Sequence, residues 1–264
     1  MAVSRVGDVD LHYRFVDCTE PWRAGRAPVV LLHGLGGDWR TWLYQVPVLC
    51  DKAAVINVDL RGHGDSSAPD HDWSIGDMAR DVVRLLRNLG AERAHLIGLS
   101  LGGMIALQFA LDYPYATSSL VLADTMAGPG PHSGDWKAAI KFIEENPMKA
   151  IARERITAAF SDSVDPVMRD YFIDRVSSND KDAYVRTARA LGDFSVADRL
   201  GEIAVPALVV VGDQDRVTPP EMSRELASGI SGARLATVPG AGHLSNLEKP
   251  ADFNHAVLEF LLPF

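Results

Sequence analysis

The sequence predicts an α/β protein built on a mostly parallel β-sheet. Short, almost entirely apolar runs recur along the chain, and most are followed by a glycine-bearing loop and a segment with helical periodicity. Strands that are apolar on both faces are typical of parallel sheets covered by helices on both sides. The runs span residues 28–32, 53–59, 94–98, 119–123, 206–212 and 234–238.

The remaining elements of the first half are also readable. Residues 6–17 alternate between polar and apolar side chains, as a half-buried strand does. The clearest helix begins with Ser74 and Asp77 at the spacing of a capping box and ends at Gly90. Its apolar side chains form one stripe, made of Ile75, Met78, Val82, Leu85, Leu86 and Leu89. We expect this helix to cross over between two parallel strands.

The alternation of strands and helices breaks off between residues 126 and 200. This segment opens with the turn-forming run AGPGPHSG and continues with helical stretches and no convincing strand. Strand character then resumes, and a helix from residue 250 closes the chain. We therefore expect one core built from residues 1–125 and 201–264, with residues 126–200 as a helical insertion.

Composition excludes several classes of protein. The chain has 264 residues, 47% of them apolar and 23% charged, which is typical of a soluble globular protein. Its longest apolar runs are about five residues, whereas a membrane span needs roughly twenty. The net charge of -9 disfavours binding to nucleic acid or to an anionic membrane. Two cysteines without a CxxC pair, and an N-terminus without a signal-peptide core, predict free thiols in the cytoplasm.

The strongest local motif is GLSLG at residues 98–102, a G-x-S-x-G pattern centred on Ser100. It directly follows one of the predicted strands and directly precedes a predicted helix. A sharp strand-to-helix turn strains the backbone of the central serine, and side chains at the flanking glycines would clash. This context favours a nucleophilic serine over a plain tight turn with an exposed hydroxyl.

A serine nucleophile needs a base to take its proton and a third group to hold that base. Asp213 and Asp215 follow the predicted strand at 206–212, and His243 follows the one at 234–238. These segments stand at C-terminal strand ends, where open α/β sheets bind their ligands. The chain order serine, aspartate, histidine is the one expected after such a turn.

Five motifs in this order resemble the α/β-hydrolase fold superfamily, in its serine hydrolase branch. They are LLHGLGG, DLRGHGDS, GLSLGG, GDQDRVTP and GAGHLSNLEKP, and the resemblance covers nearly the whole chain outside residues 126–200. The resemblance implies an eight-stranded, mostly parallel sheet flanked by helices, with residues 126–200 as a helical cap. It implies Ser100 as the nucleophile, His243 as the base and Asp215 as the orienting acid.

Two other aspartates are alternatives for the acid. Asp213 is disfavoured because the family pattern G-x-x-D-x-x-x-P fits Asp215 together with Pro219. Asp124 stands just past the predicted strand at 119–123, where some relatives carry their acid, and it ranks second.

The resemblance also implies where substrate binds. An oxyanion hole needs two donors, and the family uses backbone N–H groups that correspond to Leu35 and Leu101. We expect these residues, Trp136 of the predicted cap and Leu244 to contact the substrate.

A metal site or cofactor is not expected. His33 and His63 invite a metal hypothesis, but neither HExxH nor HxHxDH spacing is present. The loop glycines after His33 lack the GK[ST] of a phosphate loop.

The resemblance points to acyl-transfer chemistry on a small ester or lactone, with water as the second substrate. A serine at position 100 argues against dehalogenases and epoxide hydrolases, which use an aspartate there. HGLGG, GLSLGGM and GHLSNLE are most similar to 3-oxoadipate enol-lactonases and neighbouring carboxylesterases. Those lactonases tend to carry an arginine where this chain has residues 126–129, MAGP, so a less polar ester or lactone is favoured.

Three alternatives remain. Carbon–carbon hydrolases of ring-cleavage products share the triad but tend to have tryptophan where Leu244 stands. Cofactor-free haloperoxidases, which are perhydrolases, have the same catalytic groups. A non-catalytic ligand-binding receptor on this fold is the alternative of another class.

Overall fold

A single mixed sheet forms the centre of the computed structural model, which describes residues 1–21, 25–130, 132 and 135–261. Within these residues the sheet has eight strands in the order β1-β2-β4-β3-β5-β6-β7-β8. Only the β1–β2 and β2–β4 pairings are antiparallel, which confirms the predicted mostly parallel sheet. The strands are β1 (Ala2–Val6), β2 (Val9–Val16), β3 (Val29–Leu32), β4 (Val55–Val58), β5 (Ala94–Leu99), β6 (Thr117–Ala123), β7 (Ala207–Gly212) and β8 (Arg234–Val238).

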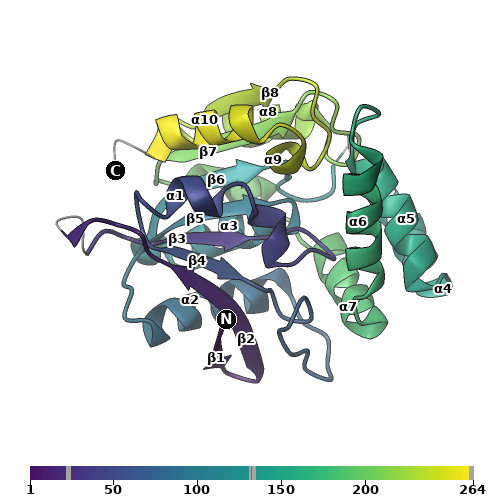
Figure 1. Cartoon of the computed structure of the whole chain (residues 1–264), viewed down its shortest axis with the longest axis horizontal. Helices are drawn as coiled ribbons and strands as arrows, with labels where there is room; N and C mark the ends of the chain where they lie inside the picture. The colour runs from purple at the N-terminus through teal and green to yellow at the C-terminus, as the bar shows by residue number, and fades with distance from the viewer. Residues whose placement is uncertain (22–24, 131, 133–134, 262–264) are drawn as a thin grey trace.

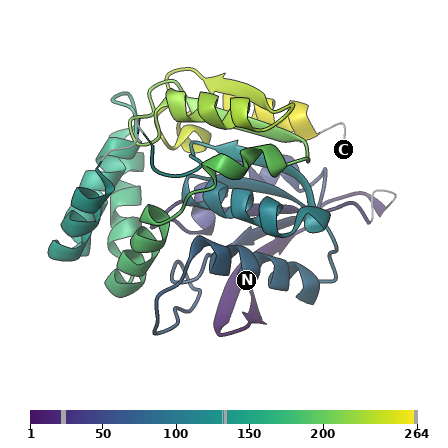
Figure 2. The same cartoon turned by 180° about the vertical axis from the view of Figure 1, so that it is seen from behind.

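Helices cover both faces of this sheet (Figure 1). The helices α2 (Ile75–Asn88), α3 (Leu101–Asp112) and α8 (Pro220–Gly229) pack on one face, which is nearest the viewer in Figure 2. The short helix α1 (Val46–Leu49) and the last helix, α10 (Pro250–Leu261), pack on the other. Strand β3 shows why its sequence is apolar throughout: Val30 and Leu32 belong to the first core cluster, and Val29 and Leu31 to the second.

The crossover helix forms as its capping signal predicts. The Ser74 hydroxyl accepts the backbone N–H of Asp77, and the Asp77 carboxylate accepts the backbone N–H of Ser74. Two of the free backbone N–H groups at the helix start are therefore satisfied. The stripe from Ile75 to Leu86 is buried against the sheet.

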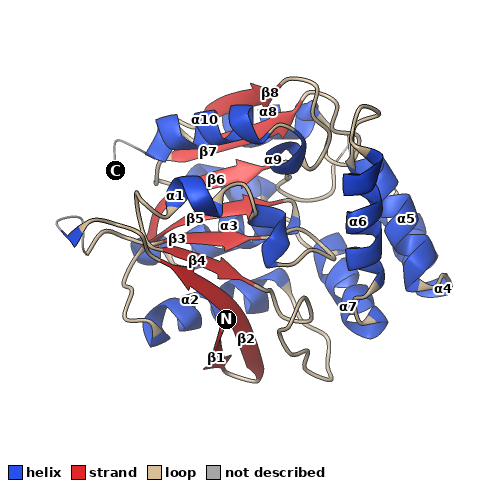
Figure 3. Cartoon of the chain, in the orientation of Figure 1, coloured by secondary structure: helices blue, strands red, loops and turns tan. Residues whose placement is uncertain are grey.

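Between β6 and β7 the chain leaves the sheet and forms four α-helices among the described residues. They are α4 (Trp136–Glu145), α5 (Met148–Ala159), α6 (Pro166–Ser177) and α7 (Lys181–Gly192), and we call them the helical insertion. They gather beside one edge of the sheet, as the blue helices at the right of Figure 3 show. That edge holds the C-terminal end of β6, from which the insertion starts. Phe160, Phe172 and Tyr184 lie at the centre of a separate apolar cluster that packs these helices together.

No helix in the described part of the chain is long and apolar enough to cross a membrane. Residues 131, 133 and 134, at the start of the segment that the sequence indicates as an insertion, lie outside the described residues.

Candidate active site

Ser100 stands at the turn between β5 and α3 in a strained conformation. Its φ of 53° and ψ of -115° place a non-glycine residue in a sparsely populated region of backbone space. Four hydrogen bonds hold it there. The N–H of Ser100 donates to the carbonyl of Ala123 at 2.9 Å. The Ser100 carbonyl accepts from Gly103 N–H at 2.9 Å, Met104 N–H at 3.2 Å and Thr125 Oγ1 at 2.6 Å. The surrounding bonds therefore fix the direction in which the serine side chain leaves the backbone.

The glycines around Ser100 are required by close backbone contacts. A Cβ at Gly98 would overlap the backbone of Gly102, and a Cβ at Gly102 would overlap the carbonyl oxygen of Leu32. A Cβ at Gly103 would lie only 2.5 Å from the Thr125 side chain. Helix α3 therefore begins in direct contact with β3 and β5. Ser100 is the single residue between the end of β5 and the start of α3.

Asp215 is held by its own loop and contacts His243. Its Oδ1 accepts the backbone N–H groups of Val217 at 2.8 Å and Thr218 at 2.9 Å. Its Oδ2 accepts the Thr218 hydroxyl at 2.8 Å and lies 2.8 Å from Nδ1 of His243. Because a carboxylate only accepts, this contact places a proton on Nδ1 and leaves Nε2 of the neutral ring as an acceptor.

The electrostatic surroundings of His243 favour its protonated form. Burial alone would lower the pKa of His243, since it disfavours the charged ring. The charge of Asp215 and the hydrogen bond to it outweigh burial and raise the pKa of His243 above its ordinary value.

Asp124, the second candidate acid, is fully buried but bonds elsewhere. Its Oδ1 accepts the N–H of Gly212 at 2.9 Å, and its Oδ2 accepts the Ser245 hydroxyl at 2.5 Å. Burial, with the neighbouring charge of Asp215, raises the pKa of Asp124 to about 8. Its φ of 44° is again unusual for a residue other than glycine. Asp124 thus ties the end of β7 to the loop that carries His243.

The third aspartate, Asp213, accepts the N–H of Gly240 at 2.7 Å at an exposed position. Within the described residues, Asp215 is therefore the one of the three candidate aspartates that hydrogen-bonds to His243.

The structure brings Ser100 and His243 to one edge of the sheet without a hydrogen bond between them among the described residues. Ser100 directly follows β5, and His243 follows β8, whose partner β7 is parallel to it. Catalytic hydrogen bonds in ligand-free enzymes are often long and tighten only when substrate binds.

The helical insertion is joined directly to the His243 loop. The backbone N–H of His243 donates to the carbonyl of Ala159, the last residue of α5, at 2.7 Å. Glu248 accepts the N–H of Gly242 at 2.8 Å and that of Ser161 at 3.0 Å, so one carboxylate bridges the two segments. We did not predict roles for Glu248 or Thr218 from the sequence. Their only signal was their position inside the motifs GHLSNLEKP and GDQDRVTP.

The loop after β3 lies on Ser100. A Cβ at Gly34 would be 3.4 Å from the Cβ of Ser100, and the next residue is Leu35. Leu101 is the first residue of α3, where backbone N–H groups have no partner inside the helix. Neither the Leu35 nor the Leu101 N–H donates a hydrogen bond to another residue that the structure describes.

The other residues expected to contact substrate are half-buried. Leu35 packs against the cluster of the sheet and against that of the helical insertion, and Leu244 also packs against two clusters. Trp136, the first residue of α4, packs against the sheet cluster, and its buried Nε1 has no partner in the described part of the chain.

His33 and His63 are both buried and bond to backbone groups. Nδ1 of His33 lies 2.8 Å from the Gly34 carbonyl, and Nδ1 of His63 lies 2.9 Å from that of Arg61. Burial lowers the pKa of His33 to about 4 and that of His63 to about 3. Among the described residues no group of histidine, cysteine and acidic side chains is arranged to hold a metal ion.

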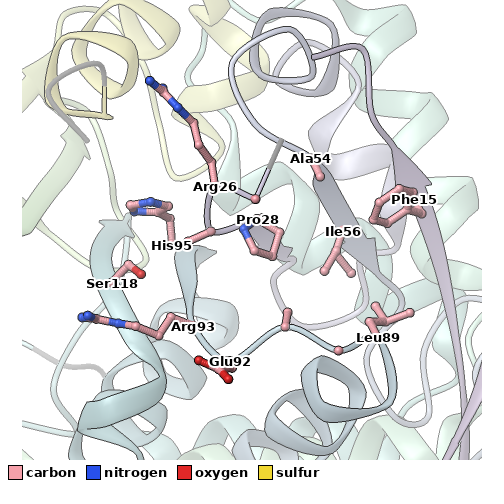
Figure 4. A pocket seen from close by; sticks show the side chains of 14 residues that line it. Phe15, Arg26, Pro28, Ala54, Ile56, Leu89, Glu92, Arg93, His95 and Ser118 are labelled. Atoms are coloured by element: carbon pink, nitrogen blue, oxygen red, sulfur yellow. The ribbon is translucent and has the colours of Figure 1, made fainter. Parts of the chain in front are cut away.

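A cavity of about 800 Å³ lies at the opposite edge of the sheet (Figure 4). Pro28 and His95, which line it, stand at the N-terminal ends of β3 and β5, whereas Ser100 follows the C-terminal end of β5. Since open parallel sheets bind ligands at the C-terminal strand ends, this cavity is separate from the candidate active site.

Comparison with known proteins agrees with this architecture. Residues 29–256 match the Alpha/beta hydrolase family. The chain belongs to this family. Among its relatives, the 3-oxoadipate enol-lactonase 2 of Acinetobacter baylyi is 30% identical over 89% of this chain and 88% of its own length. The putative carbamate hydrolase RutD of Agrobacterium fabrum is 32% identical over 90% and 94%.

A solved structure gives the same result for the fold of this α/β hydrolase. The enol-lactonase of Burkholderia xenovorans superposes with a TM-score of 0.91 at 30% identity, covering 99% of this chain and all of its own. The predicted α/β-hydrolase fold is thereby confirmed.

The electrostatics of His243 can be tested by titration. We expect NMR of histidine-labelled protein to give a pKa above 6.5 for His243 in the wild type, because Asp215 stabilises the protonated ring. In Asp215→Asn this charge is gone, burial dominates, and the pKa should fall. The matched control is Asp213→Asn, which removes an aspartate that does not bond to His243. Equal His243 pKa values in Asp215→Asn and wild type would contradict the assignment.

Proposed function

We propose that this α/β hydrolase cleaves a carboxylic ester or lactone through an acyl-enzyme on Ser100. The observation that carries the proposal is the 2.8 Å contact between Asp215 and Nδ1 of His243, at the sheet edge where Ser100 stands in a strained turn. This combination supplies a nucleophile, a base and a group that orients the base.

In this mechanism the neutral His243 accepts the Ser100 proton on Nε2 while Ser100 Oγ attacks the carbonyl carbon. The carbonyl oxygen becomes negative and accepts the backbone N–H groups of Leu35 and Leu101. His243 then gives its proton to the leaving alkoxide, and an ester bond to Ser100 remains. A water molecule that loses a proton to His243 attacks this ester, and Ser100 recovers its proton as the acid leaves.

Asp215 serves to hold the base. Its bonds from Val217, Thr218 and the Thr218 hydroxyl keep the carboxylate in place. The contact to Nδ1 selects the tautomer in which Nε2 can accept a proton, and the negative charge stabilises the imidazolium that forms.

The substrate we favour is neutral and moderately apolar. Leu35, Leu101, Trp136 and Leu244 are the proposed contacts, and the helical insertion is the proposed cap over them. Met126, where the lactonases tend to carry a cation, is buried and apolar in this chain. The named relatives include an enol-lactonase and a putative carbamate hydrolase, and lactones and carbamates both undergo nucleophilic attack at a carbonyl carbon.

The role of Ser100 is tested by Ser100→Ala. We expect kcat for an aryl ester to fall by about 10⁶-fold, the scale for a nucleophile that acts within a triad. A fluorophosphonate should label the wild type and not the variant. Ser228→Ala, at an exposed helical position, is the control that should keep full activity and labelling. A wild type that binds ester ligands without turnover or labelling would support the receptor alternative.

The choice of acid is tested by comparing two isosteric variants. Asp215→Asn should lower kcat by about 10⁴-fold, because the amide selects the wrong histidine tautomer. Asp124→Asn keeps an oxygen for the N–H of Gly212 and perturbs the two bonds from Ser245, so the loss in kcat should stay within about tenfold. A larger loss of kcat in Asp124→Asn than in Asp215→Asn would assign the acid to Asp124.

The kcat/KM of the wild type should fall as pH drops through the raised pKa of His243, because only the neutral ring is a base.

A substrate panel tests the proposed specificity. It contains aryl esters of graded chain length, small and large lactones, a dicarboxylate enol-lactone and an aryl carbamate, compared by kcat/KM. We expect neutral esters or lactones to rank above the dicarboxylate, since residues 126–129 offer it no cation. The opposite order would refute the neutral-substrate proposal. Bromination that depends on peroxide, without comparable ester hydrolysis, would instead indicate a perhydrolase.

A further inference from the structure

We propose that His33 is a positioning residue of the oxyanion hole, which orients and polarises the peptide group that joins Gly34 to Leu35. The N–H of that peptide is one of the two donors in the proposed mechanism, so this inference rests on the proposed function. His33 itself does not touch the substrate. It acts through the carbonyl of Gly34.

The hydrogen bonds around His33 determine its tautomer. The backbone N–H of Leu60 donates to Nε2 at 3.0 Å, and a nitrogen that accepts this bond carries no proton. In the neutral ring the proton is then on Nδ1, which donates to the Gly34 carbonyl at 2.8 Å. His33 is fully buried, and its pKa of about 4 keeps the ring neutral at the pH where the enzyme would work. The donor is thus permanent.

Because the peptide group is planar, the hydrogen bond to the Gly34 carbonyl also constrains the direction of the Leu35 N–H. In a trans peptide the C=O of Gly34 and the N–H of Leu35 lie in one plane and point in opposite directions. Two donors, Nδ1 of His33 and the N–H of Gly37 at 3.0 Å, converge on this carbonyl oxygen. They fix the orientation of the plane and therefore the direction of the Leu35 N–H. The same loop lies against Ser100, where the oxyanion would form.

The bond from His33 also changes the strength of the Leu35 donor. A hydrogen bond to an amide oxygen draws electron density from the amide nitrogen, and chains of such bonds strengthen each other by about 10–30% per bond. The effect is largest where water is excluded, and the His33 ring is completely buried. A neutral histidine therefore assists the developing negative charge without introducing a titrating cation.

His63 provides a natural comparison. It is equally buried, its ring centroid lies 5.3 Å from that of His33, and its Nδ1 lies 2.9 Å from the carbonyl of Arg61. That carbonyl belongs to the loop after β4 and is not part of the Gly34–Leu35 peptide. Losing His63 should cost stability without changing the oxyanion hole.

Two substitutions at position 33 separate positioning from packing. His33→Asn keeps an N–H donor near the place of Nδ1 and loses the acceptor for Leu60. His33→Gln keeps an acceptor near the place of Nε2 and loses the donor for Gly34. Both variants should be destabilised, because each leaves a buried backbone group without its partner. We expect kcat to stay within about threefold of wild type in His33→Asn and to fall about 10- to 100-fold in His33→Gln, below the full loss of one oxyanion donor.

The remaining readouts distinguish a transition-state effect. KM should change little in either variant, while the affinity for an alkylboronic acid, which forms a tetrahedral adduct on serine, should fall in His33→Gln in parallel with kcat. All assays are run below the thermal midpoint of each variant. His63→Asn and His63→Gln are the control pair, and their kcat values should be equal within about threefold.

The wild type offers a test that does not depend on variants. When the boronic acid binds, the Nδ1 proton of His33 and the amide proton of Leu35 should both move downfield in NMR spectra, because the two bonds strengthen each other. The chemical shift of the Nδ1 proton of His63 should not change. Equal kcat values for the two His33 variants would overturn this inference alone. An unchanged chemical shift of the His33 Nδ1 proton when the boronic acid binds would do the same. An unlabelled Ser100 and absent hydrolysis would instead overturn the proposed function.

Discussion

The contact of helix α3 with strands β3 and β5 is the constraint on which the candidate site depends. Gly98 and Gly102 allow backbone to meet backbone at the turn, so the helix starts directly at the sheet edge. One consequence is the strained φ of Ser100, and another is that α3 begins at the buried Leu101, whose backbone N–H has no partner inside the helix. A side chain at either glycine would push α3 away from β3 and β5 and disrupt the turn that positions Ser100.

Asp124 and Glu248 show how the other proposed catalytic groups are held relative to this turn. Asp124 follows β6 and accepts bonds from Gly212 and Ser245, which belong to two further segments. Glu248 bonds to the His243 loop and to the helical insertion. The proposed base therefore stands in a loop fastened from two sides by buried or half-buried carboxyl groups. Such groups are costly to bury alone, and each is satisfied by backbone or hydroxyl donors.

Much of this arrangement follows from local sequence patterns. Apolar runs predict the parallel strands, the capping box of Ser74 and Asp77 predicts the crossover helix, and the glycines around Ser100 predict the tight turn. Each of these depends on residues close together in the chain. The contacts of Asp124, Glu248 and Thr218 are different, because they join segments distant in sequence or depend on the exact path of a loop. The helices of the insertion were readable, but their packing on the His243 loop depends on tertiary contacts that periodicity does not encode.

The bond from His243 N–H to the Ala159 carbonyl has a consequence for changing specificity by grafting. A helical insertion taken from a relative would replace not only the lining of a binding site but also a hydrogen-bond acceptor for the backbone of the proposed base. The backbone of the segment from Ala159 to Ser161 is therefore bonded to His243 and Glu248, although the Phe160 side chain packs among the helices of the insertion. A chimera that changes substrate preference while keeping catalytic power needs its junction placed so that these three residues remain native.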